Sequence, residues 1–158
     1  MRMRGIFSRK LTGIALAAMM AFVIGGQSAI ADDSGLVTVA AKGSYSETVS
    51  ALKTMVAKNG MMVLGEINQG KVMKMTGMNL KSVSLFVGNP TMGKKMFTAD
   101  AGAGIVLPAR VDVYEQDGHT FIRYFKPSVQ FASFNKKLVM PGQMLDKKIG
   151  MMTSMLAK

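Results

Sequence analysis

The sequence of residues 109–125 is ARVDVYEQDGHTFIRYF, and it carries the clearest strand-pairing signal in the chain. Apolar and polar residues alternate on both sides of Gln116-Asp117-Gly118, a turn sequence typical of antiparallel hairpins. We therefore predict strands over 109–115 and 120–125 that pair as a β-hairpin. A hairpin at this point excludes the strict alternation of strands and helices that a fully parallel sheet requires.

Capping signals and apolar periodicity predict the elements on either side of the hairpin. Ser44 and Glu47 have the spacing of a capping box at the start of a helix, which Asn59-Gly60 ends. Strands are predicted over 36–40, 61–67 and 82–87, and further helices over 70–76, 94–100 and 141–156. This mixture predicts an α+β fold, a two-layer sandwich in which a mixed or antiparallel sheet carries its helices on one face.

The first thirty-one residues have the three parts of a cleavable secretory signal. Basic residues precede an apolar run over 11–25, which is short for a lasting transmembrane span. Ser28-Ala29-Ile30-Ala31 then offers small residues to a signal peptidase. We expect cleavage after Ala31, a periplasmic location, no transmembrane span in the mature protein, and one domain over 32–158. A retained amino-terminal anchor is the alternative.

Removal of that signal would leave sixteen Lys and Arg against nine Asp and Glu, a formal charge of +7. Such a charge favours anionic partners such as phosphate, sulfate, polyanions or an acidic lipid surface, although the scattered lysines also fit a solvated face. Nucleic acid is not expected, because an exported protein seldom meets it and no basic and aromatic binding motif is present. The lack of Cys excludes disulfides, thiolate metal sites and thiol catalysis.

A series of short motifs resembles the domain of unknown function 302 family over about residues 35–127. The motifs are Ser46-Glu47-Thr48-Val49 with Leu52, Asn59-Gly60, Gly77, Leu85-Phe86-Val87-Gly88-Asn89-Pro90, Leu107-Pro108-Ala109-Arg110-Val111, Tyr114 and Gly118. The resemblance implies a compact α+β domain that tends to form homodimers and has no assigned biochemical role. Where members of the family often have an Asp-His pair, this chain has Asn68-Gln69, which can neither ionise nor bind a transition metal well.

Residues 88–95, Gly-Asn-Pro-Thr-Met-Gly-Lys-Lys, have the spacing of a phosphate-binding loop between a predicted strand and helix. Nucleotide hydrolysis is disfavoured, because Lys95 replaces the magnesium-binding hydroxyl and Pro90 lacks an amide hydrogen. Helix-start amides beside two ammonium groups can still attract a small anion. The candidate anion-binding residues are Gly88, Asn89, Gly93, Lys94 and Lys95. The alternative is a turn that only connects strand to helix.

Methionine is unusually frequent, with thirteen of seventeen residues after Ala31. Thioethers are soft ligands that prefer Cu(I), and close spacing on a helix places sulfur atoms on one face. Met73, Met75 and Met78 are the candidate metal ligands. Two alternatives remain open. Methionine also fills ordinary cores, as the helical period predicts for Met55, Met144 and Met152, and it forms adaptable partner or dimer surfaces.

Catalytic groups are not brought together by any motif in the chain. His119 is the only histidine, and it follows Asp117-Gly118, where an exposed turn residue is expected. Strand alternation sends Asp112 and Glu115 to opposite faces, which argues against a paired acid and base. We therefore expect a periplasmic binding or accessory domain rather than an enzyme, with Cu(I) or a small anion as ligand. The alternative is an envelope structural or protein-interaction module.

Overall fold

The computed structural model describes residues 30–31 and 34–158. The predicted secretory signal therefore lies outside the described residues, apart from Ile30–Ala31. The elements are β1 (Ile30–Ala31), β2 (Leu36–Ala40), α1 (Tyr45–Lys58), β3 (Met62–Ile67), α2 (Gln69–Lys74), β4 (Ser82–Gly88), α3 (Pro90–Ala99), η1 (Ala101–Ile105), β5 (Ala109–Gln116), β6 (His119–Phe125), α4 (Pro127–Ala132), η2 (Lys136–Leu138) and α5 (Val139–Ser154), where η marks a 3-10 helix.

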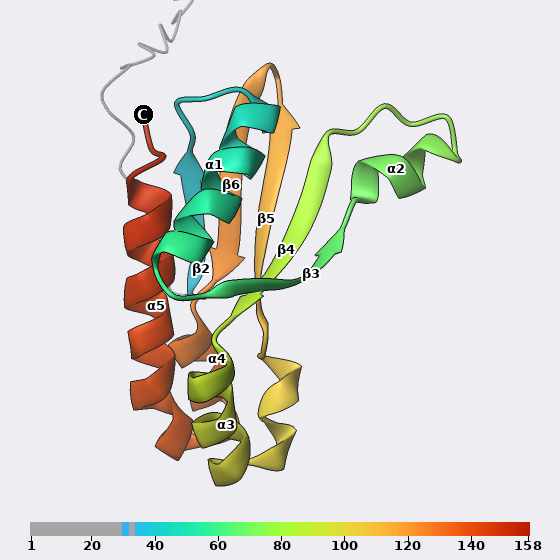
Figure 1. Ribbon diagram of the computed structural model, residues 1–158. Coiled ribbons are helices and arrows are strands. Elements are labelled where there is room, and N and C mark those ends of the chain that lie inside the picture. The colour runs from blue at the N-terminus through green and yellow to red at the C-terminus, as the bar shows by residue number, and fades with distance from the viewer. Residues whose placement is uncertain (1–29, 32–33) are drawn as a thin grey trace, which may run out of the picture.

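The strands form one six-stranded sheet in the order β1-β2-β6-β5-β4-β3, and every neighbouring pair is antiparallel. Helices α1 and α5 lie side by side over one face of this sheet, as Figure 1 shows. The predicted α+β two-layer architecture is therefore confirmed, and the sheet is wholly antiparallel. None of the helices in the described part of the chain has the length and apolar character needed to cross a bilayer.

The predicted hairpin and the predicted capping box are both present. Asp117 and Gly118 have φ angles of 51° and 74°, as a two-residue turn of the primed type requires. Ser44 caps α1, and its amide donates to the Glu47 carboxylate at 2.9 Å. Gly60, with a φ of 65°, follows the last turn of α1. These local signals set the boundaries of the hairpin and of the helix that crosses the sheet from β2 to β3.

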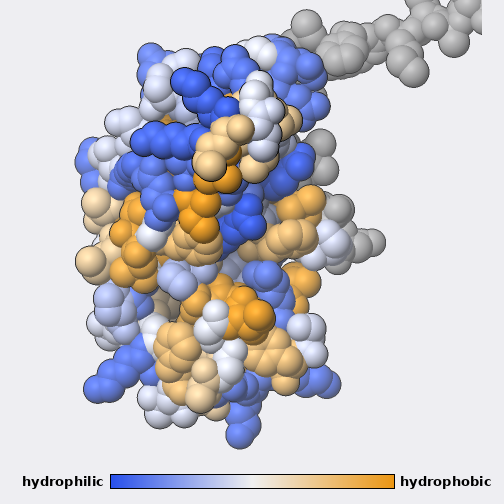
Figure 2. Space-filling view, turned by 90° about the vertical axis from the view of Figure 1, so that its right-hand side faces the viewer, coloured by the Kyte–Doolittle hydropathy of each residue, from blue (hydrophilic) through white to orange (hydrophobic). Residues whose placement is uncertain are grey.

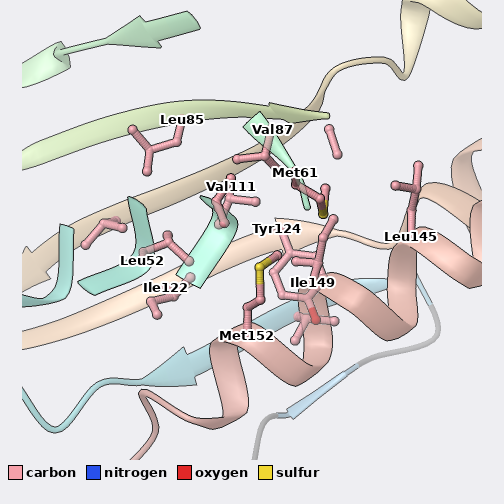
Figure 3. Packing of buried hydrophobic residues seen from close by; sticks show 14 of the residues in the cluster. Leu52, Met61, Leu85, Val87, Val111, Ile122, Tyr124, Leu145, Ile149 and Met152 are labelled. Carbon is pink, nitrogen blue, oxygen red and sulfur yellow. The ribbon is translucent and has the colours of Figure 1, made fainter. Parts of the chain in front are cut away.

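The hydrophobic core fills the space between the sheet and the two covering helices. In Figure 3, side chains of α5 point toward side chains of β5 and β6, and α1 closes the other half of the layer. The labelled core residues are Leu52, Met61, Leu85, Val87, Val111, Ile122, Tyr124, Leu145, Ile149 and Met152, none of them more than 5% exposed. Burial raises the pKa of the Tyr124 phenol, while its hydrogen bond with Thr153 acts in the opposite direction.

Two details of the predicted helices are wrong. Helix α3 begins at Pro90 and not at Lys94, because Asn89 caps it and proline fits the first helical position. Met144, expected in the interior, is 56% exposed. The buried row of α5 runs through Leu145, Ile149 and Met152, so Met144 falls on the outer face. Met55 does pack against the core, and Met152 is buried as predicted.

Helix α4 was not predicted from the sequence, and it packs tightly against α5. The amide of Ser128 donates to the Asp146 carboxylate at 3.2 Å, and the Ser128 hydroxyl donates to the same group. Gly142 lies directly beneath Ser128, and a Cβ atom at Gly142 would stand 2.7 Å from the Ser128 Cα. The two helices can approach this closely only because Gly142 has no side chain.

Gly142→Ala should therefore lower the free energy of unfolding by about 1–2 kcal/mol, because the backbone clash outweighs the better helix propensity of alanine. Gly150→Ala is the matched control in the same helix, since its new methyl would meet only the Tyr124 hydroxyl at 3.5 Å. That variant should keep or slightly raise stability. Urea unfolding of both variants measures the difference, and equal stability would contradict the close approach.

Candidate functional site

Asn89 organises the turn between β4 and α3, where the sequence predicted an anion site. Its Oδ1 accepts a hydrogen bond from the Met92 amide at 2.9 Å, and its Nδ2 donates to the Gly60 carbonyl at 2.6 Å. The Asn89 carbonyl accepts from the Gly93 amide at 2.8 Å. Two amides of the loop are thus bonded within the turn, and Pro90 has no amide hydrogen. The geometry is that of a capped strand-to-helix turn rather than a phosphate cradle.

The same turn borders a pocket of about 240 Å³. Four of the five predicted anion-binding residues line it, namely Gly88, Asn89, Gly93 and Lys94, whereas Lys95 does not. The rest of the wall is mainly apolar and comes from β3, α3, α5 and the segment before β5. These residues are Leu64, Pro90, Met92, Met96, Phe97, Leu107, Pro108 and Leu145. The sequence predicted a small-anion site at this turn, and it did not predict the mainly apolar wall.

A β-bulge supplies one side of the pocket. Val63 pairs with Val87 and Gly65 with Phe86, so Leu64 is an extra residue in β3. Leu64 is half exposed and lies over Gly88, where a Cβ atom would stand 2.9 Å from the Leu64 Cδ1. The bulge and the missing side chain at Gly88 together place Leu64 in the pocket wall.

Among the described residues, Lys94 is the only charged one that lines this pocket. Its side chain is exposed, and it takes part in none of the ion pairs found among the described residues. An apolar cavity with one ammonium group at its edge can hold a molecule with an apolar body and an anionic end. The described lining residues include no Asp, Glu, His, Ser, Thr or Tyr.

A polar network lies on the sheet face opposite α1 and α5, and its grouping of residues from β4, β5 and α2 was not predicted from the sequence. Arg110 binds the Asp112 carboxylate through two nitrogen atoms, at 2.9 and 3.1 Å. Ser84, fully buried, donates to Asp112 at 2.5 Å and accepts from the Arg110 Nε at 3.0 Å. Gln69 also donates to the Ser84 hydroxyl. Gln69 belongs to the pair that replaces the family's Asp-His, so this position faces the network.

Arg123 completes the polar part of this open face. Its Nε donates to the Thr38 hydroxyl at 3.0 Å, and its guanidinium lies 5.0 Å from the centre of the Tyr114 ring. Burial raises the pKa of Tyr114, and the charge of Arg123 opposes that rise. Arg110, Asp112 and Arg123 border a hollow of about 510 Å³ on this face. The sequence signal for this polar face is the alternation of polar residues along β4 and β5.

The candidate metal ligands all belong to α2 and the segment that follows it. Met75 is 88% and Met78 is 54% exposed, while Met73 is half buried. The Met78 amide donates to the Met73 carbonyl at 3.3 Å, so the turn brings these two backbones together. His119 is exposed, as expected from its place at the hairpin. Within the described residues, no group of three or more His, Asp or Glu could hold a metal ion.

A family model described as "Domain of unknown function DUF302" matches residues 37–157. The chain belongs to the DUF302 family. The match extends beyond residue 127 and includes α5, so the carboxy-terminal helix is part of the DUF302 domain. A crystal structure of an uncharacterised conserved DUF302 protein from Bacillus stearothermophilus has a TM-score of 0.73 and 21% identity, covering 77% of this chain and 98% of that one. This likeness supports the fold.

Two curated relatives are named as fluoride-specific ion channels. This DUF302 protein is 32% identical over 84 residues to "Fluoride-specific ion channel FluC 1" of Brucella suis biovar 1 and to the protein of the same name in Brucella abortus biovar 1. The matched part is 52% of this chain in both cases, and 33% and 31% of the two relatives. The chain therefore spans about a third of the length of the curated relatives that it matches.

Replacement of Asn89 tests its role in the turn. Asn89→Ala removes the cap of α3 and the bond to the Gly60 carbonyl, and it should lower the free energy of unfolding by about 1–3 kcal/mol. Asn89→Ser keeps a cap acceptor and loses only the hydrogen bond to the Gly60 carbonyl. Its free energy of unfolding should therefore fall by about half as much. Urea unfolding provides the comparison. Two variants of equal stability would show that the cap does not hold the turn.

Proposed function

We propose that this DUF302 protein is a binding module for a small amphipathic anion. The observation that carries the proposal is the apolar pocket beside α3, with Lys94 at its edge. The apolar body of the ligand enters between Leu64, Phe97 and Leu107, and its anionic group, such as a carboxylate, meets the Lys94 ammonium group. This proposal keeps the anion expected from the sequence and adds an apolar part to it.

The energetics of the pocket favour such a ligand over a bare inorganic anion. Each buried methylene contributes about 0.8 kcal/mol, so a chain of several methylenes supplies much of the free energy of a micromolar to millimolar complex. An exposed ion pair with Lys94 contributes at most about 1 kcal/mol and mainly fixes orientation. Inorganic phosphate would gain only the second contribution, and two of the neighbouring amides are already bonded within the turn.

We further propose that the module acts in the cell envelope after export and cleavage behind Ala31. Cleavage at that position would remove β1 and leave a five-stranded sheet. Only 37 residues of this chain lie outside the DUF302 match, so more than half of the 84 residues that match the relatives fall within the DUF302 domain. The domain itself is therefore similar to part of relatives that are named as ion channels, which supports a place near a membrane. Because these relatives are named as fluoride-specific channels, fluoride is included as a probe.

Isothermal titration with octanoate, fluoride and inorganic phosphate tests the pocket. Gly93→Leu should reduce octanoate affinity at least about tenfold, because a Cβ atom at Gly93 meets no atom within 4 Å and the larger side chain can occupy the pocket mouth. Lys94→Gln should reduce the affinity about two- to fivefold.

Lys95→Gln is the matched control, since Lys95 is the neighbouring exposed lysine and does not line the pocket. It should bind octanoate like the unaltered protein. Because octanol has no charge, Lys94→Gln and Lys95→Gln should bind it with the same affinity. Failure of octanoate to bind, or equal binding by Gly93→Leu, would reject the pocket as the site.

Cu(I) binding by the α2 segment is a second candidate function, favoured by the solvent exposure of Met75 and Met78. Leucine at Met73, Met75 and Met78 should lower Cu(I) affinity at least about tenfold, because the soft thioether ligands are lost while apolar volume is kept. Competition with a chromophoric Cu(I) chelator measures the change. The control places leucine at Met140, Met144 and Met151, which are exposed on α5. Equal affinities would remove the α2 cluster from consideration.

An envelope structural or protein-interaction module is the remaining proposal. It predicts no response to octanoate, fluoride, phosphate or Cu(I). It also predicts an assembly, either the homodimer that the family resemblance implies or a complex with another envelope protein. Native mass spectrometry of the protein recovered from its own envelope reports the cleavage site, the oligomeric state and any retained ligand in one measurement.

A further inference from the structure

Residues 67–99 contain no Asp or Glu and five lysines. Lys81 is paired with Glu115 at 2.7 Å, but Lys71 and Lys74 take part in none of the ion pairs among the described residues. Both are exposed on α2. About a quarter of the domain thus contains basic residues and no acidic ones, and two of these lysines lie on one short helix.

Residues 69–81 form a projection that we call the α2 arm. It extends away from the body of the molecule in Figure 1, and α2 contains no buried residue. Figure 2, which views the side of the molecule bearing β3 and β4, shows hydrophobic areas beside hydrophilic ones. The arm exposes three large apolar side chains, each by about half or more: Val72, Met75 and Met78. Exposed apolar residues beside unpaired lysines are typical of surfaces that enter a membrane interface.

The base of the α2 arm is fixed even though its far part is not packed. A Cβ atom at Gly70 would stand 2.3 Å from the Leu80 carbonyl oxygen, so the two sides of the arm touch there. Asn68 caps α2 by accepting from the Lys71 amide at 2.9 Å, and Gln69 donates to Ser84 of the sheet. The chain therefore holds these apolar residues in solvent on a defined support, without using them for its own core.

We propose that the α2 arm docks on an anionic membrane surface. Met75, Met78 and Val72 enter the boundary between head groups and acyl chains, and Lys71 and Lys74 pair with lipid phosphates. The absence of carboxylates between residues 67 and 99 makes the arm complementary to a negative surface. Two basic residues and a few flexible apolar ones suit a deformable lipid surface without any preformed groove. This inference does not depend on the pocket beside α3.

Co-sedimentation with vesicles tests the docking surface. Two vesicle types are compared, one of phosphatidylglycerol and phosphatidylcholine and one of phosphatidylcholine alone. The protein is used as recovered from cells expressing the full chain, with a copper chelator present so that thioether-bound metal makes no contribution. The difference between the two vesicle types isolates the anionic component, because any apolar contribution of residues 1–31 is common to both. We expect at least tenfold stronger binding to the vesicles that contain phosphatidylglycerol.

Charge and apolar variants separate the two parts of the surface. Lys71→Gln with Lys74→Gln should weaken binding to the anionic vesicles about tenfold or more, since each lysine near such a surface contributes roughly fivefold. Lys136→Gln with Lys137→Gln removes the same charge from η2, which contacts α3, α4 and α5, and should have a much smaller effect. If both double variants lose the same amount of vesicle affinity, net charge alone explains the binding and the proposal is overturned.

Met75→Ser with Met78→Ser should weaken binding several-fold by removing the apolar anchors. Met140→Ser with Met144→Ser is its control, because both residues are exposed on α5. Far-UV circular dichroism checks that each variant keeps its fold. Docking by insertion of the arm is wrong if the protein binds anionic vesicles no better than vesicles of phosphatidylcholine alone. It is also wrong if the Met75→Ser with Met78→Ser variant binds as well as the unaltered protein.

Discussion

The antiparallel register of β4, β5 and β6 sets one constraint on the whole domain, because it collects the apolar residues of three strands on a single face. Leu85 pairs with Val111, and Val113 with Ile122, and each of these side chains is buried. Such a face must be covered, and the chain has two long helices with which to cover it. Helix α1 crosses from one side of the sheet to the other, and α5 returns along it. The opposite face carries the polar network around Ser84.

The pocket follows from how the covering layer ends. Helix α3 starts directly after β4, because Asn89 and Pro90 allow no further strand residues, and it therefore stands at the end of the sheet. The bulge in β3 brings Leu64 over Gly88, while Leu145 reaches the same place from α5. Elements that pack well within the core meet imperfectly at this border. The cavity is thus a consequence of topology, and the one charged residue among its described lining residues is Lys94 of α3.

Local signals in the sequence were sufficient for most of the fold. The hairpin and the capping box depend on residues within a few positions of each other, so Asp117-Gly118 and Ser44 with Glu47 could be recognised without any tertiary information. The predicted start of α3 at Lys94 was too late, because Asn89 followed by Pro90 forms a good helix start, with a side-chain cap and a proline at the first helical position. Met144 was misplaced because the inner face of α5 is set by its contacts with the sheet and with α4, which the sequence does not specify.

The functional surfaces needed more than local signals. The contact of Ser84 with Asp112 joins β4 to β5, and Leu64 enters the pocket wall only through the β3 bulge, so both required the register of the sheet. Gln69 links the α2 arm to the polar network, because it belongs to the arm and donates to Ser84 of β4. Ser84 also donates to Asp112 and accepts from Arg110. The base of the arm is therefore joined by hydrogen bonds to the strand that ends at the pocket.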